Sequence, residues 1–311
     1  MKKCLVIIAA RGLGDLIYHL PLLRSLHESY KEKLIIISNK VNHSKDVFQN
    51  ETFHEEIVYF DNTRLSFFKT IKNIIKIKNL INKFNAENLI MTGSPRRLMI
   101  PVYLSNAKKK IIFGSGKFFL NKDNKYSHLT YSEKIFYYTE NLNLPIKKKD
   151  YFLKISENNK KEKSDSKYKI FISLDSHHDQ NNWHIKNYIK IIEKLLINNS
   201  KIFINFAPKK KYFLDFFSSE IKKSKQVSFT YHKNISEIIE IINSCNYVVG
   251  NESGPVCLGA ALKKEVHSIY IPLHTPPESK IISNKIYYYN TDKEDDESII
   301  NKIIGRILVK N

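Results

Sequence analysis

The chain has 311 residues, 42% of them hydrophobic, which fits two globular α/β domains better than one small core. Its formal net charge of +20 comes from lysines spread along the whole sequence, without a zinc finger, helix-turn-helix or aromatic RNA-binding motif, so nucleic acid is not an expected partner. No apolar stretch approaches the roughly 20 residues that span a bilayer. No two of the three cysteines form a CxxC pair of the kind found in zinc sites. We expect a soluble, cytoplasmic protein, with peripheral contact between its basic surface and acidic lipid headgroups as an open alternative.

In the first half, short apolar runs alternate with amphipathic helical stretches, a pattern typical of parallel sheets with crossover helices. The predicted strands are Leu5–Ala10, Leu34–Ser38, Glu56–Phe60, Leu89–Thr92 and Ile111–Phe113. The predicted helices are about Asp15–Tyr30, Ser66–Phe84, a shorter stretch after Pro95, and Tyr131–Leu142. We interpret Ser66–Phe84, which has lysines on one side and Ile74, Ile75, Ile77 and Leu80 on others, as amphipathic packing.

A polar stretch, residues 156–167, contains no apolar side chain and predicts a linker between two domains, 1–155 and 168–311. The same alternation restarts after it. The predicted strands are Tyr168–Leu174, Lys201–Phe206, Val227–Phe229, Tyr247–Gly250 and Val266–Ile271. The predicted helices are Ile185–Ile197, Lys210–Lys222, Ile235–Asn243, a helix from Gly254, and a terminal helix, about Asp296–Val309, for which packing back on the first domain is an alternative. Two such domains place the carboxyl ends of both sheets at an interdomain cleft.

The most informative segment is Cys245–Leu262, which reads as a buried strand, a tight polar turn and a helix of small and apolar residues. The free N–H groups of the helix's first turn and the positive end of its dipole favour a phosphate or diphosphate. Ser253 and Gly254 allow a ligand to approach closely, and Glu252 can accept hydrogen bonds from sugar or ribose hydroxyls. The alternative is an ordinary strand-to-helix crossover with a capping serine.

A second polar loop, Arg11–Asp15, follows the first predicted strand and opens a helix. A dinucleotide-binding fingerprint requires a third glycine where Ile17 stands, so NAD is not expected. Asp15 at the helix start is suited to capping that helix and equally to acting as a general base above the sheet edge. These residues alone leave both interpretations open.

Four blocks of the sequence, in order, resemble the bacterial heptosyltransferases of glycosyltransferase family 9. They are Gly14–Leu26, with its Gly-Asp and Pro-x-Leu-Arg-x-Leu pattern, Asn106–Gly114, Leu174–Ile192 around Trp183, and Asn251–Leu262, with its Glu-Ser-Gly-Pro turn. Together they span nearly the whole chain. The resemblance implies an α/β GT-B fold, in which two Rossmann-like domains have parallel sheets that face an interdomain cleft. It also implies an acceptor-binding first domain and a donor-binding second domain.

Carried over by position, the resemblance makes Asp15 the base that deprotonates the acceptor hydroxyl. Glu252 takes the place of the family's donor-binding aspartate, and Ser253 and Gly254 hold the donor diphosphate. The remaining candidates are Ser176, Asn181 and Lys186 for the donor, and Arg11, Gly14, Arg96 and Arg97 for an anionic acceptor. Arg96 and Arg97 follow the predicted strand Leu89–Thr92 at its carboxyl end, where they either bind an anionic acceptor or are solvated.

Two positions depart from the family pattern. The family's lysine two places before the tryptophan is Asn181 here, and the histidine of its Gly-Pro-x-His segment is Cys257. A cation expected near the donor phosphates is therefore missing, and Arg11, Lys186 or the lysines of 209–211 are candidates to replace it. Trp183, the single tryptophan, is expected to be a packing residue that anchors the helix beginning near His184.

We expect no metal and no cofactor beyond the sugar-nucleotide substrate. The cluster His177, His178, Asp179 and His184 fits no standard zinc spacing; contact with phosphate or sugar and a plain exposed loop are its other interpretations. An acidic run, Asp292 to Asp296, is not an Asp-x-Asp metal motif and complements the dipole of the last helix.

The expected function is inverting, metal-independent transfer of a sugar from a nucleotide-diphospho-sugar, with ADP-heptose as one candidate donor. The expected acceptor is an anionic glycolipid, such as a lipopolysaccharide or lipooligosaccharide, or another surface glycan. Two alternatives remain: a sugar-nucleotide epimerase or hydrolase of the same fold, and a catalytically degenerate protein that only binds sugar nucleotides.

Overall fold

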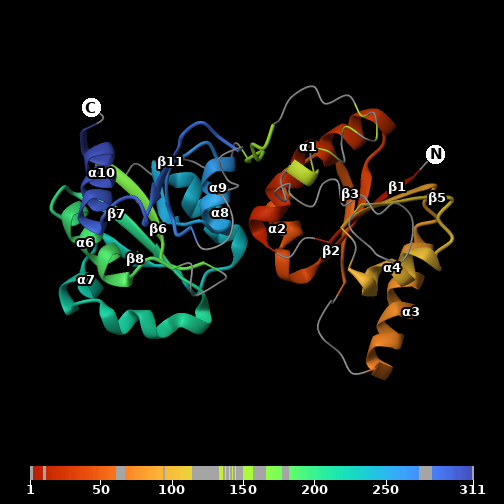
Figure 1. The fold of residues 1–311 in the computed structure, drawn as a ribbon, viewed down its shortest axis with the longest axis horizontal. Helices are drawn as coiled ribbons and strands as arrows, with labels where there is room; N and C mark the ends of the chain where they lie inside the picture. Colours follow the sequence, from red (N-terminus) through yellow and green to blue (C-terminus); the bar gives the residue numbers. More distant parts are fainter. Residues whose placement is uncertain are drawn as a thin grey trace. The chain divides into compact units, whose positions relative to one another are not determined.

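The computed structural model describes residues 3–9, 12–60, 67–93, 95–113, 133–135, 137, 140, 142, 144, 150–156, 166–176, 182–272 and 282–309. The chain forms two compact units, Met1–Lys154 and Ile155–Asn311. Each unit is built around its own parallel sheet with helices on both faces (Figure 1). The predicted fold class, two Rossmann-like α/β units, is confirmed.

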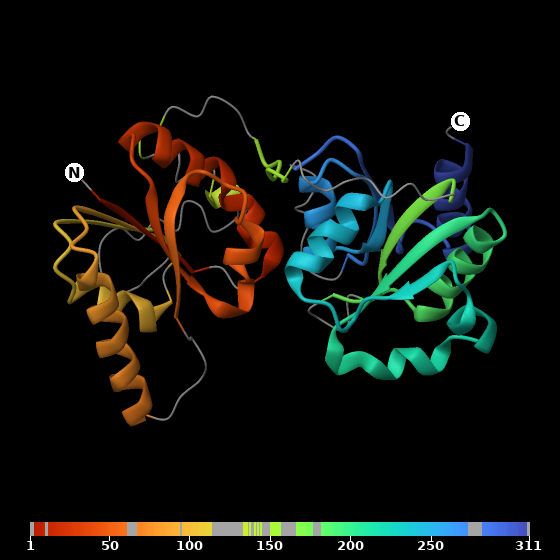
Figure 2. The ribbon, with the colours of Figure 1, turned by 180° about the vertical axis from the view of Figure 1, so that it is seen from behind.

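The first unit contains a five-stranded sheet in the order β3-β2-β1-β4-β5, with every neighbouring pair parallel. Its strands are β1 (Cys4–Ile8), β2 (Leu34–Asn39), β3 (His54–Phe60), β4 (Asn88–Thr92) and β5 (Lys109–Phe113). Its helices are α1 (Leu13–Tyr30), α2 (Ser44–Val47), α3 (Phe67–Lys83) and α4 (Arg96–Tyr103), with a short 3₁₀ turn η1 (Lys40–Asn42) before α2. In Figures 1 and 2, α1 and α2 lie on one face of this sheet and α3 and α4 on the other.

The second unit contains a six-stranded sheet in the order β11-β10-β9-β6-β7-β8, again with all pairs parallel. Its strands are β6 (Tyr168–Ser173), β7 (Ser200–Asn205), β8 (Val227–Phe229), β9 (Tyr247–Asn251), β10 (Glu265–Tyr270) and β11 (Ile286–Asn290). Its helices are α6 (Ile185–Leu196), the 3₁₀ helix η4 (Pro208–Phe216), α7 (Ser219–Lys223), α8 (Ile235–Ser244), α9 (Gly254–Ala261) and α10 (Asp296–Val309). Figure 2 shows α8 and α9 on one face of this sheet and α6 and α10 on the other.

The strand order reverses once in each sheet, between β1 and β4 and between β6 and β9. Open parallel sheets bind ligands outside the carboxyl ends of their strands at this switch point. The loops after β1 and β4, and the loops after β6 and β9, are therefore the places where each unit is expected to hold a ligand.

The central strands are continuous apolar runs, because the strands of a parallel sheet covered on both faces are buried on both sides. All five residues of β1 and all five of β4 are buried. In the second unit, β6 and β7 pack against α6 and α10, and the buried face of α10 consists of Ile299, Ile300, Ile303 and Ile307. The apolar face of α10 thus packs within the core of the second unit.

Each of the ten predicted strands is present, with ends that differ by no more than two residues. The single helix predicted at Lys210–Lys222 is wrong: the chain forms η4, turns to an extended backbone at Phe217, and starts α7 with Ser218 as its cap. The strand β11 was not predicted. Of the predicted helix Tyr131–Leu142, the described residues 133–135, 137 and 140 are helical, and most of the predicted linker lies outside the described residues.

Candidate functional site

The switch point of the second unit is organised by Asn251, the last residue of β9. Its side-chain Oδ1 accepts a hydrogen bond from the backbone N–H of Trp183 at 2.8 Å, and its Nδ2 donates to the carbonyl of Leu174 at 3.0 Å. Asn251 is fully buried. It therefore fixes the loop after β6 and the entry to α6 against the end of β9. This places Ser176, three residues after the end of β6, at the same sheet edge as Glu252 and Ser253.

The start of α9 is the part of this edge best suited to an anion. Ser253 is the N-cap residue, with extended backbone (φ −156°, ψ 170°), but its hydroxyl does not cap the helix. Among the described residues, this buried hydroxyl has no hydrogen-bond partner. The first N–H groups of a helix have no acceptor within the helix, and here they belong to Gly254 and Val256 because Pro255 has none. The turn thus presents a hydroxyl and backbone donors at the positive end of a helix.

Glu252 is held beside this turn by the neighbouring strand β10. Its Oε2 accepts a hydrogen bond from Ser268 Oγ at 2.8 Å, and its backbone N–H donates to the carbonyl of Ile269 at 3.2 Å. Tyr270 follows on the same strand, and burial together with the nearby Asp292 and Glu252 carboxylates raises the pKa of its phenol. A carboxylate anchored in this way is suited to accept a hydrogen bond from a hydroxyl of a bound sugar or ribose.

Two glycines allow close packing around β9. A Cβ at Gly250 would lie 2.7 Å from the carbonyl oxygen of Ser173 on β6, and a Cβ at Gly259 would lie 2.7 Å from Val248 Cγ2 on β9. Real Cβ atoms do not approach other atoms that closely, so both positions require glycine, which has no side chain. Gly250 thus permits the close spacing of β6 and β9, and Gly259 permits the close approach of α9 to β9.

Trp183 anchors the loop that leads into α6, as predicted. It is buried, its ring packs edge-on against Tyr188 at 5.2 Å, and its Nε1 donates to Asp296 Oδ1 at 2.7 Å. The other oxygen of Asp296 accepts from Asn187 Nδ2 at 2.7 Å. Asp296, at the start of α10, therefore does more than complement a helix dipole: it links α10 to Trp183 and to α6.

The basic residues near this edge have different roles. Lys210 is buried and its Nζ lies 3.3 Å from Asp175 Oδ2, so its charge is engaged within the protein. Lys209 and Lys211 are exposed. Lys186 is also exposed, in the first turn of α6, where its backbone N–H donates to the ring Nδ1 of the N-cap His184 at 3.2 Å.

In the first unit, Asp15 lies in the first turn of α1, after β1, and is partly buried together with Gly14. Its Oδ2 accepts a hydrogen bond from the backbone N–H of Gly12 at 3.1 Å. The predicted capping role is thus present. It leaves the predicted role as a base untested, since a carboxylate that caps a helix start can also face a ligand.

His19, one helical turn after Asp15, joins α1 to the other side of the switch point. Its Nδ1 donates to the carbonyl of Asp15 at 2.6 Å, and its Nε2 accepts from Thr92 Oγ1 at the end of β4 at 2.7 Å. The acceptor-only carbonyl fixes this tautomer. Burial lowers the pKa of His19 to about 4, so the ring is neutral at physiological pH.

Sequence reasoning did not identify His19, Thr92, Ser268 or Asp296. His19 stands four residues after Asp15 inside the Gly14–Leu26 block, and that helical spacing was an available signal. Ser268 and Asp296 act across the fold and carry no local signal. Arg96 begins α4 directly after β4 and Arg97 follows it. Arg11, Asn181 and the predicted cluster His177–Asp179 lie outside the described residues.

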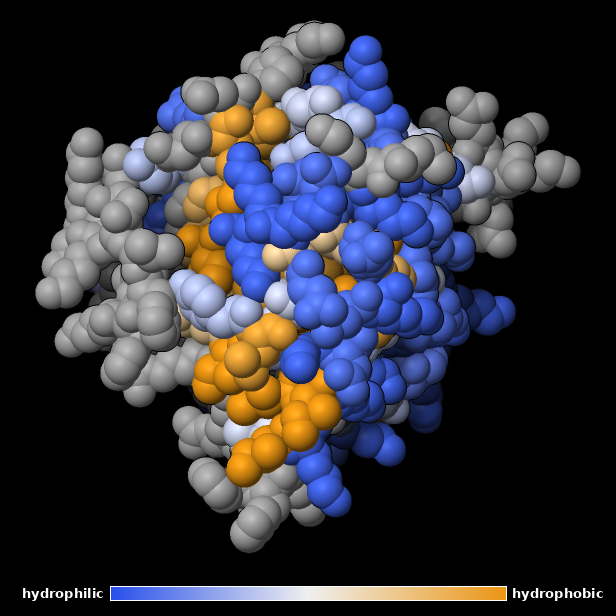
Figure 3. Space-filling view, turned by 90° about the vertical axis from the view of Figure 1, so that its right-hand side faces the viewer, coloured by the Kyte–Doolittle hydropathy of each residue, from blue (hydrophilic) through white to orange (hydrophobic). Residues whose placement is uncertain are grey.

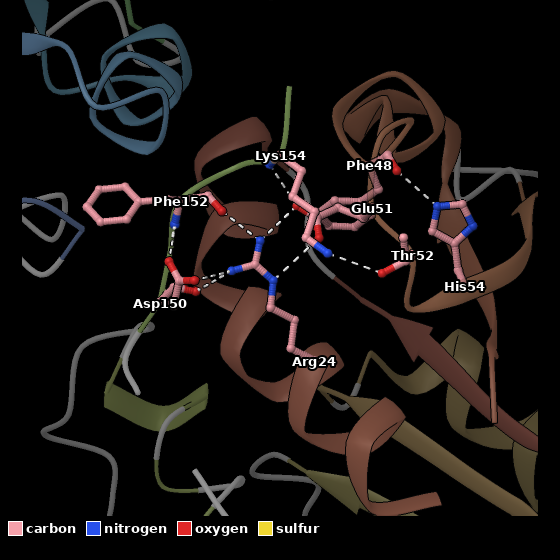
Figure 4. A network of polar contacts seen from close by, with 8 residues as sticks. All are labelled: Arg24, Phe48, Glu51, Thr52, His54, Asp150, Phe152 and Lys154. Carbon is pink, nitrogen blue, oxygen red and sulfur yellow. Dashed lines mark hydrogen bonds and ion pairs between the residues drawn. The ribbon is translucent and has the colours of Figure 1, made fainter. Parts of the chain in front are cut away.

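Arg24, from the Pro-x-Leu-Arg-x-Leu pattern, has a structural role (Figure 4). Its Nη2 donates to Glu51 Oε1 at 2.8 Å and to the carbonyl of Phe152 at 2.6 Å, and its Nη1 pairs with Asp150 Oδ2 at 3.0 Å. Glu51 Oε1 also accepts from the backbone N–H of Lys154 at 3.0 Å. Arg24 and the buried Glu51 together fasten the last residues of the first unit to α1.

Within the described ranges, histidine, cysteine, aspartate and glutamate side chains nowhere gather in a group of three that could hold a metal ion. Cys4, Cys245 and Cys257 are buried free thiols. In the part of the chain that the structure describes, no helix has the length and apolar character needed to cross a bilayer.

The model of glycosyltransferase family 9 (heptosyltransferase) matches residues 117–298, more than half of the chain. No curated protein matches the chain in sequence.

Several solved structures share the fold of the whole chain. E. coli ADP-heptose LPS heptosyltransferase II superposes with a TM-score of 0.77 at 13% identity, covering 100% of this chain and 99% of that one. A family 9 glycosyl transferase from Veillonella parvula gives 0.75 at 14% identity, covering 99% and 89%. E. coli heptosyltransferase WaaC with ADP gives 0.73 at 12% identity, covering 98% of each chain. At these identities the likeness shows the fold, which is the GT-B fold with its two Rossmann-like units.

Proposed function

Because the chain belongs to glycosyltransferase family 9, we propose that it transfers a sugar from a nucleotide-diphospho-sugar to a lipopolysaccharide, lipooligosaccharide or other surface-glycan acceptor. One observation carries this proposal: the Glu252–Ser253–Gly254 turn at the switch point of the second unit, with an uncapped helix start and a buried hydroxyl that lacks a partner among the described residues. A hydroxyl buried without a partner costs stability, and a ligand phosphate would satisfy it.

The donor diphosphate binds at the start of α9. Backbone N–H groups of Gly254 and Val256, the Ser253 hydroxyl and the helix dipole supply positive potential where the leaving group gains charge. Glu252, held by Ser268, accepts a hydrogen bond from a hydroxyl of the donor sugar or ribose. Ser176 contributes from the loop after β6, and Lys186 adds positive charge from α6.

Asp15 acts as the base for the acceptor. Its carboxylate removes the proton from the acceptor hydroxyl as that oxygen attacks the anomeric carbon. The bond from the anomeric carbon to the diphosphate oxygen breaks, and the nucleoside diphosphate leaves with the electron pair. A single displacement inverts the anomeric configuration. Gly14, Arg11, Arg96 and Arg97 are the proposed acceptor contacts.

The reaction needs neither a metal ion nor a cofactor in this proposal, because the helix start takes the place of a cation at the leaving diphosphate. ADP-heptose is the first candidate donor, since E. coli heptosyltransferase II is named for it and the WaaC structure contains ADP. Asn181 stands where the family pattern has a lysine, so the donor's phosphates would rely more on the backbone donors here. The enzyme is proposed to work in the cytoplasm.

Calorimetric titration of ADP, UDP, GDP and CMP into the protein at moderate salt tests the donor site. Saturable one-to-one binding of one nucleotide is expected, and it would name the donor class for transfer assays. Binding of none of them would contradict the proposal and favour a degenerate protein.

A degenerate sugar-nucleotide-binding protein is the second candidate, because Lys210 is engaged by Asp175 and Asn181 replaces a lysine. A protein of this kind would bind a nucleotide but release no product with any acceptor. Product formed from the donor alone would instead indicate an epimerase or hydrolase. The variant Asn181→Lys, which restores the family's lysine, distinguishes a site that has lost a phosphate contact from one that binds the phosphates through other groups. A gain in donor affinity would indicate the lost contact, and no gain would indicate that other groups have replaced it.

A further inference from the structure

An exposed apolar surface lies on the helical layer formed by α3 and α4, which pack against each other. Ile71 and Ile75 on α3 are 41% and 52% exposed, and Ile100 and Leu104 on α4 and its C-cap are 47% and 56% exposed. Each pair is four residues apart and so lies on one side of its helix. Figure 3 views the side of the molecule on which α3 and α4 lie, and hydrophobic side chains gather there beside a broad hydrophilic area. We call these four residues the α3–α4 surface.

These exposures differ from what amphipathic packing alone requires. The core-facing side of α3 is formed by Ile77 and Ile81, which are buried. Ile75 was expected to pack, and its exposure corrects that interpretation. A helix with one apolar side for the core needs no second apolar ridge, so Ile71 and Ile75 are unexplained by the fold of the unit.

Positive charge lies directly beside the apolar ridge. Lys72 and Lys76 follow Ile71 and Ile75 in sequence and are both exposed. Helix α3 contains five lysines, and neither α3 nor α4 contains an acidic residue. An apolar ridge next to a lysine ridge is the pattern of a helix that lies in the headgroup region of an acidic membrane.

We propose that the α3–α4 surface docks the protein on the surface of a membrane rich in anionic lipids. The isoleucines and Leu104 enter the boundary between headgroups and acyl chains, while Lys72 and Lys76 meet lipid phosphates. A nucleic acid would use the lysines but leave the isoleucines in water, and a neutral protein groove would use the isoleucines but not the charge. A membrane of acidic lipid provides both an apolar phase for the isoleucines and negative charge for the lysines.

The location of this surface fits a lipid-linked substrate. Helices α1, α3 and α4 each begin at the carboxyl edge of the first sheet, and Ile71 and Ile100 lie in the second turns of α3 and α4. Asp15 lies in the first turn of α1 at that edge. Docking would bring this edge of the sheet close to the lipid surface. Membrane binding itself does not depend on the proposed transfer reaction. Its role in bringing the enzyme to a lipid-linked acceptor does rest on that proposed function.

Co-sedimentation with vesicles tests the proposal without any sugar nucleotide. The full chain is mixed with vesicles of equal parts phosphatidylcholine and phosphatidylglycerol, and separately with pure phosphatidylcholine. We expect strong binding to the anionic vesicles, weakening as salt is raised, and little binding to the neutral ones. The double variant Lys72→Gln/Lys76→Gln should bind about 25-fold more weakly, from a loss of about fivefold per lysine. Ile71→Asp/Ile75→Asp should lose at least as much.

Matched controls come from the second unit. Ile197→Asp introduces one aspartate, where the α3 variant introduces two, at the 86% exposed isoleucine that forms the C-cap of α6, and Lys222→Gln/Lys223→Gln removes two lysines from α7. Both controls should change vesicle binding less than threefold. Equal losses in the controls and the α3–α4 variants would overturn the proposal, as would unchanged binding in the α3–α4 variants.

Two further measurements keep the result interpretable. Circular dichroism should show the same melting temperature for Lys72→Gln/Lys76→Gln as for the unaltered chain, because both side chains are exposed. Light scattering detects self-association: a dimer that the α3–α4 variants abolish, without vesicle binding in the unaltered chain, would show that a second copy covers the surface and would overturn the proposal. Nucleotide binding measured by calorimetry should be unchanged in these variants, so failure of membrane docking and failure of the donor site remain distinguishable.

Discussion

The ring nitrogen Nε2 of His19 lies 2.7 Å from the hydroxyl of Thr92, and both side chains are buried at the switch point of the first sheet. Because the other ring nitrogen contacts the carbonyl of Asp15, a single neutral imidazole connects the end of β4 to the turn that carries the proposed base. Protonation of this ring would leave two donors facing a site built for one donor and one acceptor.

Stability should therefore depend on pH through His19. Its folded pKa of about 4 lies below the ordinary value of 6.5, so the unfolded chain binds the proton first. This contribution is fully present above pH 6.5 and is lost as the pH falls from about 6.5 to 4, in total about 3 kcal/mol. Urea unfolding of the unaltered chain and of His19→Gln at pH 7.5 and 4.5 measures it. The variant should lose less stability between the two pH values, and identical losses would contradict the assignment.

Asp15→Asn should abolish turnover in a folded protein. An asparagine oxygen can still accept the Gly12 N–H, so the helix start is preserved, while an amide cannot take the acceptor proton. Loss of a general base typically lowers the rate by about 10²–10⁴-fold. Initial-rate assays measure this effect and calorimetry should show unchanged donor binding. Asp46→Asn, which alters a carboxylate in the first turn of α2, should retain full turnover; normal turnover in Asp15→Asn would remove Asp15 from the mechanism.

Ser253→Ala should separate binding from stability. The hydroxyl has no partner among the described residues and does not cap α9, so its removal should leave the free energy of unfolding unchanged or slightly higher. Donor affinity should fall by about tenfold, the loss of one charge-assisted hydrogen bond. Ser200→Ala is the control, because it removes another buried hydroxyl that has no hydrogen-bond partner in the described part of the chain, at the opposite edge of the sheet. An equal affinity loss in both variants would exclude a specific role for Ser253.

Two glycines should respond oppositely to alanine. A methyl group at Gly250 would meet the backbone of Ser173, so Gly250→Ala should lower the free energy of unfolding by about 1–3 kcal/mol. Gly305 lies inside α10, where an added Cβ would meet no described atom within 4 Å beyond its chain neighbours and the backbone of its own helix. Gly305→Ala should therefore raise the free energy of unfolding by about 0.5–1 kcal/mol. Urea denaturation of both variants measures these changes in the free energy of unfolding. An unchanged free energy of unfolding in Gly250→Ala would show that β6 and β9 can move apart without loss of stability.

The strands could be predicted because fully buried parallel strands leave a local signal, a run of apolar residues such as Cys4–Ile8. The glycine-rich turns at Asp15 and Ser253 were visible for the same reason, since each follows such a run directly. Strand β11 was missed because Ile286–Asn290 is only half-buried and rich in tyrosine. The aromatic run was an available signal for a strand.

The partners of the site residues could not be predicted, because they come from distant positions. Trp183 and Asp296 are 113 residues apart, and His19 and Thr92 are 73 apart. Lysines at 209–211 look equivalent in sequence, yet only Lys210 faces inward to Asp175, owing to the 3₁₀ turn of η4. Packing between elements decides such contacts, and no periodicity within one element encodes it.

The Arg24–Glu51 contacts determine where the first unit can be cut. Glu51 is almost completely buried and shares one oxygen between Arg24 and the Lys154 backbone. A fragment ending at residue 149 would leave Arg24 without its carbonyl acceptors and Glu51 without the N–H of Lys154. A fragment of residues 1–154 keeps every member of that network. The shortest independently folding piece of this half of the chain should therefore end at Lys154.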